Sequence, residues 1–142
     1  MSAYKDITDE ASPEDLVTMA LSELEEVAKE ISNWRDGMMG TNLESSEKYQ
    51  MLDDAHNTLT SLPTIDPDVW PHAESRVTYS QRVPKRKTRS PSRMVRVENA
   101  IEKVAALVNF YENLDDAEDH SDLIEELREI ADLSVELPGM YG

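Results

Sequence analysis

Apolar residues recur at helical spacing in the first half of the chain, in two stretches on either side of a glycine-containing loop. Steps of four and three residues separate the members of the first stripe, so they share one helix face. They are Ala20, Leu24, Val27, Ile31, Trp34 and Met38. Ser12-Pro13-Glu14-Asp15 favours a helix start just before this stripe. The second stripe consists of Tyr49, Leu52, Ala55 or His56, Leu59 and Leu62, and Pro63 ends it. Together they predict a helical hairpin over residues 12–62.

The C-terminal part repeats this organisation over residues 93–138. Ser90-Pro91 precedes a third stripe, which consists of Val97, Ile101, Val104, Val108 and Tyr111. An acidic stretch interrupts the pattern, and Asp122 with Glu125 forms a capping box ahead of a fourth stripe. This last stripe consists of Leu123, Leu127, Ile130 and Leu137. A second helical hairpin is therefore predicted, related to the first by duplication or only by a shared amphipathic pattern.

The apolar stripe of each hairpin needs a cover, and packing the two hairpins together is the simplest way to provide one. We therefore predict an all-α fold in which two antiparallel helical hairpins form a four-helix bundle, within one chain or across a dimer. Residues 1–11 are predicted to be a flexible acidic N-terminus, and residues 139–142 a C-terminal tail. With 142 residues, of which 39% are hydrophobic and 6% aromatic, the chain suits a compact unit with an aliphatic core.

Between the hairpins, residues 63–92 lose the helical periodicity and contain five of the seven prolines. This composition predicts a long proline-rich basic linker or arm. Trp70 stands just before Pro71 in this segment, and an aromatic residue in that setting either anchors the linker on the bundle or contacts a partner. Trp70 and, further along, Tyr79 are the candidate partner anchors.

Charge is segregated along the chain. The net charge is −16, yet the segment from Arg76 to Val97 has eight basic residues and no acidic one. Basic side chains on an extended backbone can neutralise phosphates, and neighbouring hydroxyls can donate further hydrogen bonds to them. The candidates for binding nucleic acid or an acidic partner are Arg82, Lys85, Arg86, Lys87, Arg89, Arg93 and Arg96. Two other hypotheses stay open: the arm docks on the protein's own carboxylates, or it serves as a targeting peptide.

A local resemblance extends from the first predicted helix into the second. Trp34-Arg35-Asp36, Thr41-Asn42-Leu43-Glu44 and Lys48-Tyr49 resemble a helix-loop-helix segment of uncharacterised phage-type small proteins. The resemblance covers a minor part of the chain. It implies a phage or mobile-element origin and no particular activity.

No catalytic or metal centre is predicted. The chain has no cysteine, and its three histidines, His56, His72 and His120, are not spaced as ligands on one helix face. The acidic run from Asp115 to Asp122 lacks the glycine and the closing glutamate of an EF-hand calcium loop. Four glycines provide no phosphate-binding loop. We therefore expect a protein that is not an enzyme and needs no cofactor.

These patterns favour a non-catalytic macromolecular-interaction protein that uses an acidic helical scaffold and a basic arm to bind a protein or nucleic acid. One alternative is a virion-type assembly component whose arm contacts neighbouring subunits or packaged nucleic acid. Another is an acidic nucleic-acid mimic that inhibits a host nucleic-acid enzyme. A protein partner is expected, and homo-oligomerisation is an open alternative. No apolar run approaches the roughly 20 residues of a membrane span, so we expect no membrane contact and an intracellular location, in the host cytoplasm or in a virion.

Overall fold

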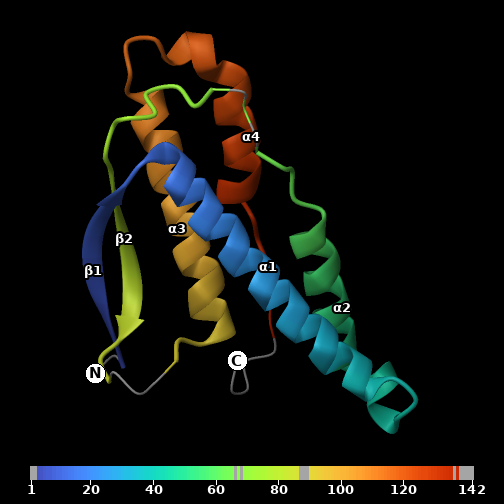
Figure 1. Cartoon of the computed structure of the whole chain (residues 1–142). Helices are drawn as coiled ribbons and strands as arrows, with labels where there is room; N and C mark the ends of the chain where they lie inside the picture. Colours follow the sequence, from blue (N-terminus) through green and yellow to red (C-terminus); the bar gives the residue numbers. More distant parts are fainter. Residues whose placement is uncertain (1–2, 66, 68, 87–89, 136, 138–142) are drawn as a thin grey trace.

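The computed structural model describes residues 3–65, 67, 69–86, 90–135 and 137, and in these it contains both helices and strands (Figure 1). The main elements are β1 (Tyr4–Ala11), α1 (Pro13–Met38), α2 (Glu47–Thr60), β2 (Val77–Pro84), α3 (Arg93–Glu112) and α4 (Ser121–Ala131). The short 3-10 helices η1 (Asn42–Ser45) and η2 (Ala117–His120) lie between α1 and α2 and between α3 and α4. The fold is therefore mixed α/β.

The predicted all-α four-helix bundle is wrong, because β1 and β2 pair into an antiparallel two-stranded sheet. Its register runs from Tyr4 opposite Pro84 to Ala11 opposite Val77. β1 occupies the segment that was expected to be a flexible N-terminus, and β2 lies inside the expected linker. The sequence did carry a short signal for β2, since apolar and polar residues alternate from Val77 to Ser80 in the manner of a half-buried strand.

α3 is the central element, because it packs against α1, α4 and β2 (Figure 1). α1 in turn packs along α2. Since three elements surround α3, its buried residues extend beyond the single stripe that the sequence predicted. Asn99 and Lys103 lie outside that stripe, are buried, and donate hydrogen bonds to residues of β2. The sheet thus covers a face of α3 that a simple helical bundle would leave exposed.

The predicted helical stripes form much of the core. The largest fully buried side chains come from all four α-helices and include Leu16, Leu24, Ile31, Leu52, Leu107, Tyr111, Leu127 and Ile130. Ser12 caps α1, accepting a hydrogen bond from the Asp15 amide at 3.3 Å as predicted. α4 begins at Ser121, before Asp122, so the predicted capping box is wrong. In the part of the chain that the structure describes, no helix has the length and apolar character needed to cross a membrane.

Lys103 is a charged residue within the core, with 7% of its surface exposed. Its Nζ donates to Gln81 Oε1 at 2.9 Å and lies 5.4 Å from the centroid of the Tyr79 ring. Burial lowers the pKa of Lys103 below its usual value, and the charge of Glu23 offsets part of this effect. The protonated amine is therefore less stable here than in water.

Lys103→Met is expected to raise the free energy of unfolding at pH 7 by about 1 kcal/mol, because an apolar chain of similar volume replaces a buried charge. The pKa of Lys103 is lower in the folded state, so between the two pKa values the unfolded chain binds more protons. The wild type therefore gains stability as pH rises through this window. In urea unfolding, the free energy of unfolding of Lys103→Met should exceed that of the wild type by less and less as pH rises from neutral toward the usual lysine pKa. Lys103→Arg keeps the charge and should gain no stability; an advantage of Lys103→Met that stays constant with pH would contradict this explanation.

Candidate functional site

The basic segment predicted from the sequence runs through β2 into the start of α3, and Arg82 is held at the sheet. Arg82 Nη1 lies 3.0 Å from Glu98 Oε2, and its guanidinium lies over the Tyr4 ring, 5.0 Å from the centroid. The Asn99 side chain also binds the backbone of Arg82 twice: Oδ1 accepts from the Arg82 amide and Nδ2 donates to the Arg82 carbonyl, each at 2.8 Å. Arg82 is therefore part of the interface between β2 and α3.

Two further arginines, in the first turn of α3, pair with carboxylates of α1. Arg93 Nε donates to Glu30 at 3.2 Å, and its guanidinium lies 5.3 Å from the Trp34 ring centroid. Arg96 pairs with the same Glu30 at 2.6 Å and lies 3.7 Å from Glu23. These contacts correspond to the hypothesis that the basic segment docks on the protein's own carboxylates. They also neutralise part of the acidic face of α1 that a nucleic-acid mimic would use.

The turn after β2 carries two cations that, unlike these arginines, are exposed to solvent. Lys85 and Arg86 are exposed, and neither forms an ion pair with any residue that the structure describes. The backbone amide of Lys85 donates to Ala3 O at 2.9 Å, which extends the strand pairing to this residue. Lys87 and Arg89, the other two candidates, lie outside the described residues.

Lys5 joins these cations from the opposite strand. It lies opposite Val83 in the sheet. Because side chains two positions apart on a strand share a face, Lys5 and Lys85 are diagonal neighbours on one face of the sheet. Lys5 is exposed and, within the described ranges, has no ion pair either. We call Lys5, Lys85 and Arg86 the basic sheet end. Sequence reasoning missed Lys5 because only the strand register brings it there.

The two predicted aromatic anchors are both packed against the protein itself. Trp70 is half-buried and packs against the hydrophobic core, which fits the interpretation of this residue as an anchor of the connecting segment. Tyr79 is a core residue with 7% exposure, and burial raises the pKa of its hydroxyl. Tyr79 therefore offers little surface to a partner.

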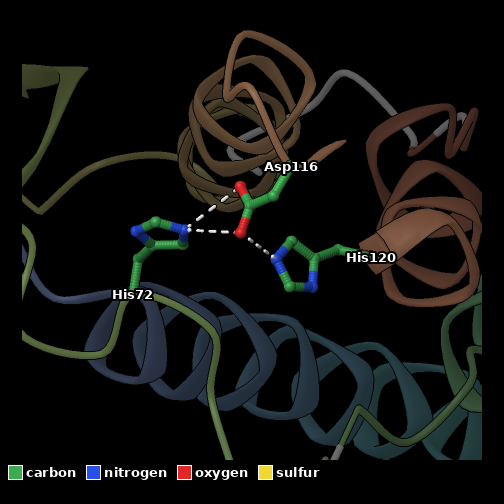
Figure 2. A group of neighbouring side chains, drawn as sticks. All are labelled: His72, Asp116 and His120. Atoms are coloured by element: carbon green, nitrogen blue, oxygen red, sulfur yellow. Dashed lines mark hydrogen bonds and ion pairs between the residues drawn. The ribbon is translucent and has the colours of Figure 1, made fainter. Parts of the chain in front are cut away.

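A second group of polar side chains, all potential metal ligands, lies near the C-terminal end of α3. His72, Asp116 and His120 meet there, from the segment before β2 and from the connection between α3 and α4 (Figure 2). Asp116 Oδ2 lies 3.1 Å from His72 Nε2 and 3.0 Å from His120 Nε2. Hydrogen bonds hold the pKa of Asp116 below its usual value, and the one from His120 contributes more than the one from His72. We call these three residues the histidine–aspartate cluster; they are the described residues best placed to hold a metal.

The sequence indicated only half of this cluster. Asp116 and His120 are four residues apart, a spacing that can bring two ligands together on one helical turn. His72 is 44 residues away from Asp116, and its approach depends on how the segment after α2 crosses α3. The prediction of no metal centre considered only ligands close in sequence, so it could not include this arrangement.

Comparison of the chain with protein-family models, curated proteins and solved structures gives no match. The resemblance to phage-type helix-loop-helix proteins therefore stays a prediction.

Proposed function

We propose that the protein is a non-catalytic interaction protein that binds nucleic acid, with the basic sheet end contacting the phosphates. The observation that supports this proposal is that the basic segment contains two kinds of cation, some paired with the protein's own carboxylates and some exposed. Arg82, Arg93 and Arg96 already pair with carboxylates of the same chain, whereas Lys85 and Arg86 are exposed and form no ion pair with a described residue. A paired arginine must give up its carboxylate to bind phosphate, so the exposed cations provide the larger gain.

The backbone around these cations is ordered by the sheet, which reduces the entropy lost on binding. Lys5 belongs to β1, and the Lys85 amide is hydrogen-bonded to Ala3. The sequence continues with two more cations, Lys87 and Arg89. Figure 1 shows the sheet on the opposite side of the molecule from α2, so a nucleic acid at the basic sheet end is well separated from that helix.

The acidic remainder of the protein restricts how a polyanion can approach. A net charge of −16 repels nucleic acid at long range. At 0.1 M salt, charges more than about 10 Å apart are largely screened from one another, so a local contact with the basic sheet end can still form. The proposal therefore requires binding in one orientation, with the acidic helices turned away from the nucleic acid.

Loss of the basic sheet end should weaken this binding strongly. We expect the triple variant Lys5→Gln, Lys85→Gln, Arg86→Gln to bind a labelled single-stranded oligonucleotide at least ten times more weakly at low salt. Each lost phosphate contact reduces the slope of log K against log salt by about 0.7 on a single strand, so three contacts reduce it by roughly 2. Fluorescence anisotropy over a salt series measures both quantities.

A matched control separates location from total charge. The triple variant Lys29→Gln, Lys48→Gln, Arg128→Gln removes the same formal charge from α1, α2 and α4, and it should bind like the wild type. If both triple variants lose affinity equally, the effect comes from net charge and the proposed site is wrong. Absence of any wild-type binding to single-stranded or duplex nucleic acid across the whole salt series, 0.1 M included, would refute the proposed function itself.

A further inference from the structure

The turn that carries His72 is held firmly against α3. Tyr111, which is fully buried, donates its hydroxyl hydrogen to Pro71 O at 2.7 Å. The Ser75 amide donates to His72 O at 2.9 Å and closes the turn. His72 itself has a φ of 52°, in the left-handed region, and it is the one non-glycine residue with a positive φ in the described chain. Such a conformation is costly for a residue with a side chain and is often found at binding sites.

The two other members of the cluster come from one short segment. Asp116 precedes η2 and His120 ends it, and the Asp119 amide donates to Asp116 O at 3.0 Å within the same turn. One potential ligand atom from each of His72, Asp116 and His120 lies within 4.8 Å of the other two. Figure 2 shows the two imidazole rings approaching the carboxylate from opposite sides. The three donors therefore converge on one point between two distant parts of the chain.

We propose that His72, Asp116 and His120 bind one divalent transition-metal ion, with Zn²⁺ as the preferred ion. In a tetrahedral zinc site with bonds of about 2.0–2.1 Å, neighbouring ligand atoms lie roughly 3.3 Å apart. The Nε2 atoms of His72 and His120 lie 3.1 Å and 3.0 Å from Asp116 Oδ2, so small side-chain movements bring an ion into bonding distance of all three. Two imidazoles and one carboxylate suit zinc and similar metals, whereas calcium and magnesium require more oxygen ligands.

The surroundings of the cluster favour a bound cation. The His72 ring meets the Phe110 ring edge-on at a centroid distance of 6.3 Å, and the Tyr111 ring lies 6.1 Å from that of His120. These aromatic side chains restrict the two imidazoles. The neighbouring carboxylates are Asp115, Glu118, Asp119 and Asp122, which add negative potential at the site. His72 is exposed, which leaves room for water as a fourth ligand.

A metal ion at this position would fasten the segment before β2 to the connection between α3 and α4. It would act at the opposite end of β2 from the basic sheet end, so the inference does not depend on nucleic-acid binding. An ion that binds only the folded state raises thermal stability with its concentration. The metal would therefore serve as a structural link between two segments that are distant in sequence.

Direct titration with Zn²⁺ and Co²⁺ tests this proposal on the full-length protein after treatment with a chelator. We expect one Zn²⁺ per chain by calorimetry, and with Co²⁺ an absorption spectrum typical of a site with nitrogen and oxygen ligands. Saturating Zn²⁺ should raise the melting temperature. Asp116→Asn and His120→Gln keep polar side chains of similar size. Each should weaken Zn²⁺ binding by more than the roughly 10–100-fold that loss of an outer-shell partner costs, and should abolish the thermal shift.

His56→Gln is the matched control, because His56 lies on α2 next to Arg35, outside the cluster, and its loss should leave Zn²⁺ affinity unchanged. His72→Asn provides an independent variant of the third ligand, since asparagine tolerates the left-handed conformation. Circular dichroism establishes that each variant is folded. The proposal is overturned if the folded ligand variants bind Zn²⁺ as tightly as the wild type. It is also overturned if millimolar Ca²⁺ or Mg²⁺ displaces Co²⁺, since that behaviour belongs to a general acidic surface.

Discussion

Deletion of residues 2–11 is expected to lower the free energy of unfolding by roughly 3–6 kcal/mol, because β2 loses its partner along its whole length. β1 pairs with β2 from Tyr4 to Ala11, and the Tyr4 hydroxyl accepts a hydrogen bond from the Ser92 amide at the start of α3. A flexible N-terminal tail could be removed at almost no cost. Urea unfolding followed by circular dichroism distinguishes the two outcomes.

Proline substitutions test the same strand without shortening the chain. The Lys85 amide bonds Ala3 O, so by the alternation of antiparallel pairs the amides of Ile7 and Asp9 point toward β2, and that of Thr8 points outward. Asp9→Pro should therefore remove a hydrogen bond of the sheet, whereas Thr8→Pro removes none. We expect Asp9→Pro to lose at least twice as much stability as Thr8→Pro. Equal losses would contradict the observed register.

The second large effect is expected at Asn99, whose side chain replaces a neighbouring strand along the outer edge of β2. Asn99 Oδ1 accepts from the Arg82 amide and Asn99 Nδ2 donates to Arg82 O, both at 2.8 Å, and the residue is 8% exposed. Asn99→Ala leaves both backbone groups without a partner, and an unsatisfied buried polar group costs about 1–3 kcal/mol. We therefore expect a loss of about 2–4 kcal/mol in the free energy of unfolding.

Asn109→Ala is the control for this substitution. Asn109 lies on the same helix, is exposed, and has a side-chain hydrogen bond only to the nearby Asn113 among the described residues. Its replacement should change stability by less than about 0.5 kcal/mol. If the two alanine variants unfold at the same urea concentration, Asn99 does not stabilise the edge of β2.

The helices could be predicted from the sequence because their signal is local. Apolar spacing placed Leu24, Val27 and Ile31 on one face of α1, and all three are buried. The sheet was missed because strand pairing depends on contacts between distant segments, here Tyr4 with Pro84. Short strands also carry weaker patterns than long helices, and the prolines around β2 are typical of loops and linkers.

The candidate sites were predicted only in part, for a similar reason. Lys85 and Arg86 were identified from charge alone, since a run of cations is visible in any sequence. Charge could not separate them from Arg93 and Arg96, because the pairing with Glu30 exists only after α1 packs on α3. The histidine–aspartate cluster likewise required the fold, since no local spacing connects His72 to Asp116.

Nucleic-acid binding at the basic sheet end is the central claim, and an NMR titration of ¹⁵N-labelled protein with a single-stranded oligonucleotide tests it most directly. At low salt, the backbone amides of Lys5, Lys85 and Arg86 and their immediate neighbours should shift in proportion to the bound fraction, while amides of α2 and α4 stay in place. Shifts centred on Arg93 and Arg96, or on the acidic helices with the basic sheet end unchanged, would contradict the claim.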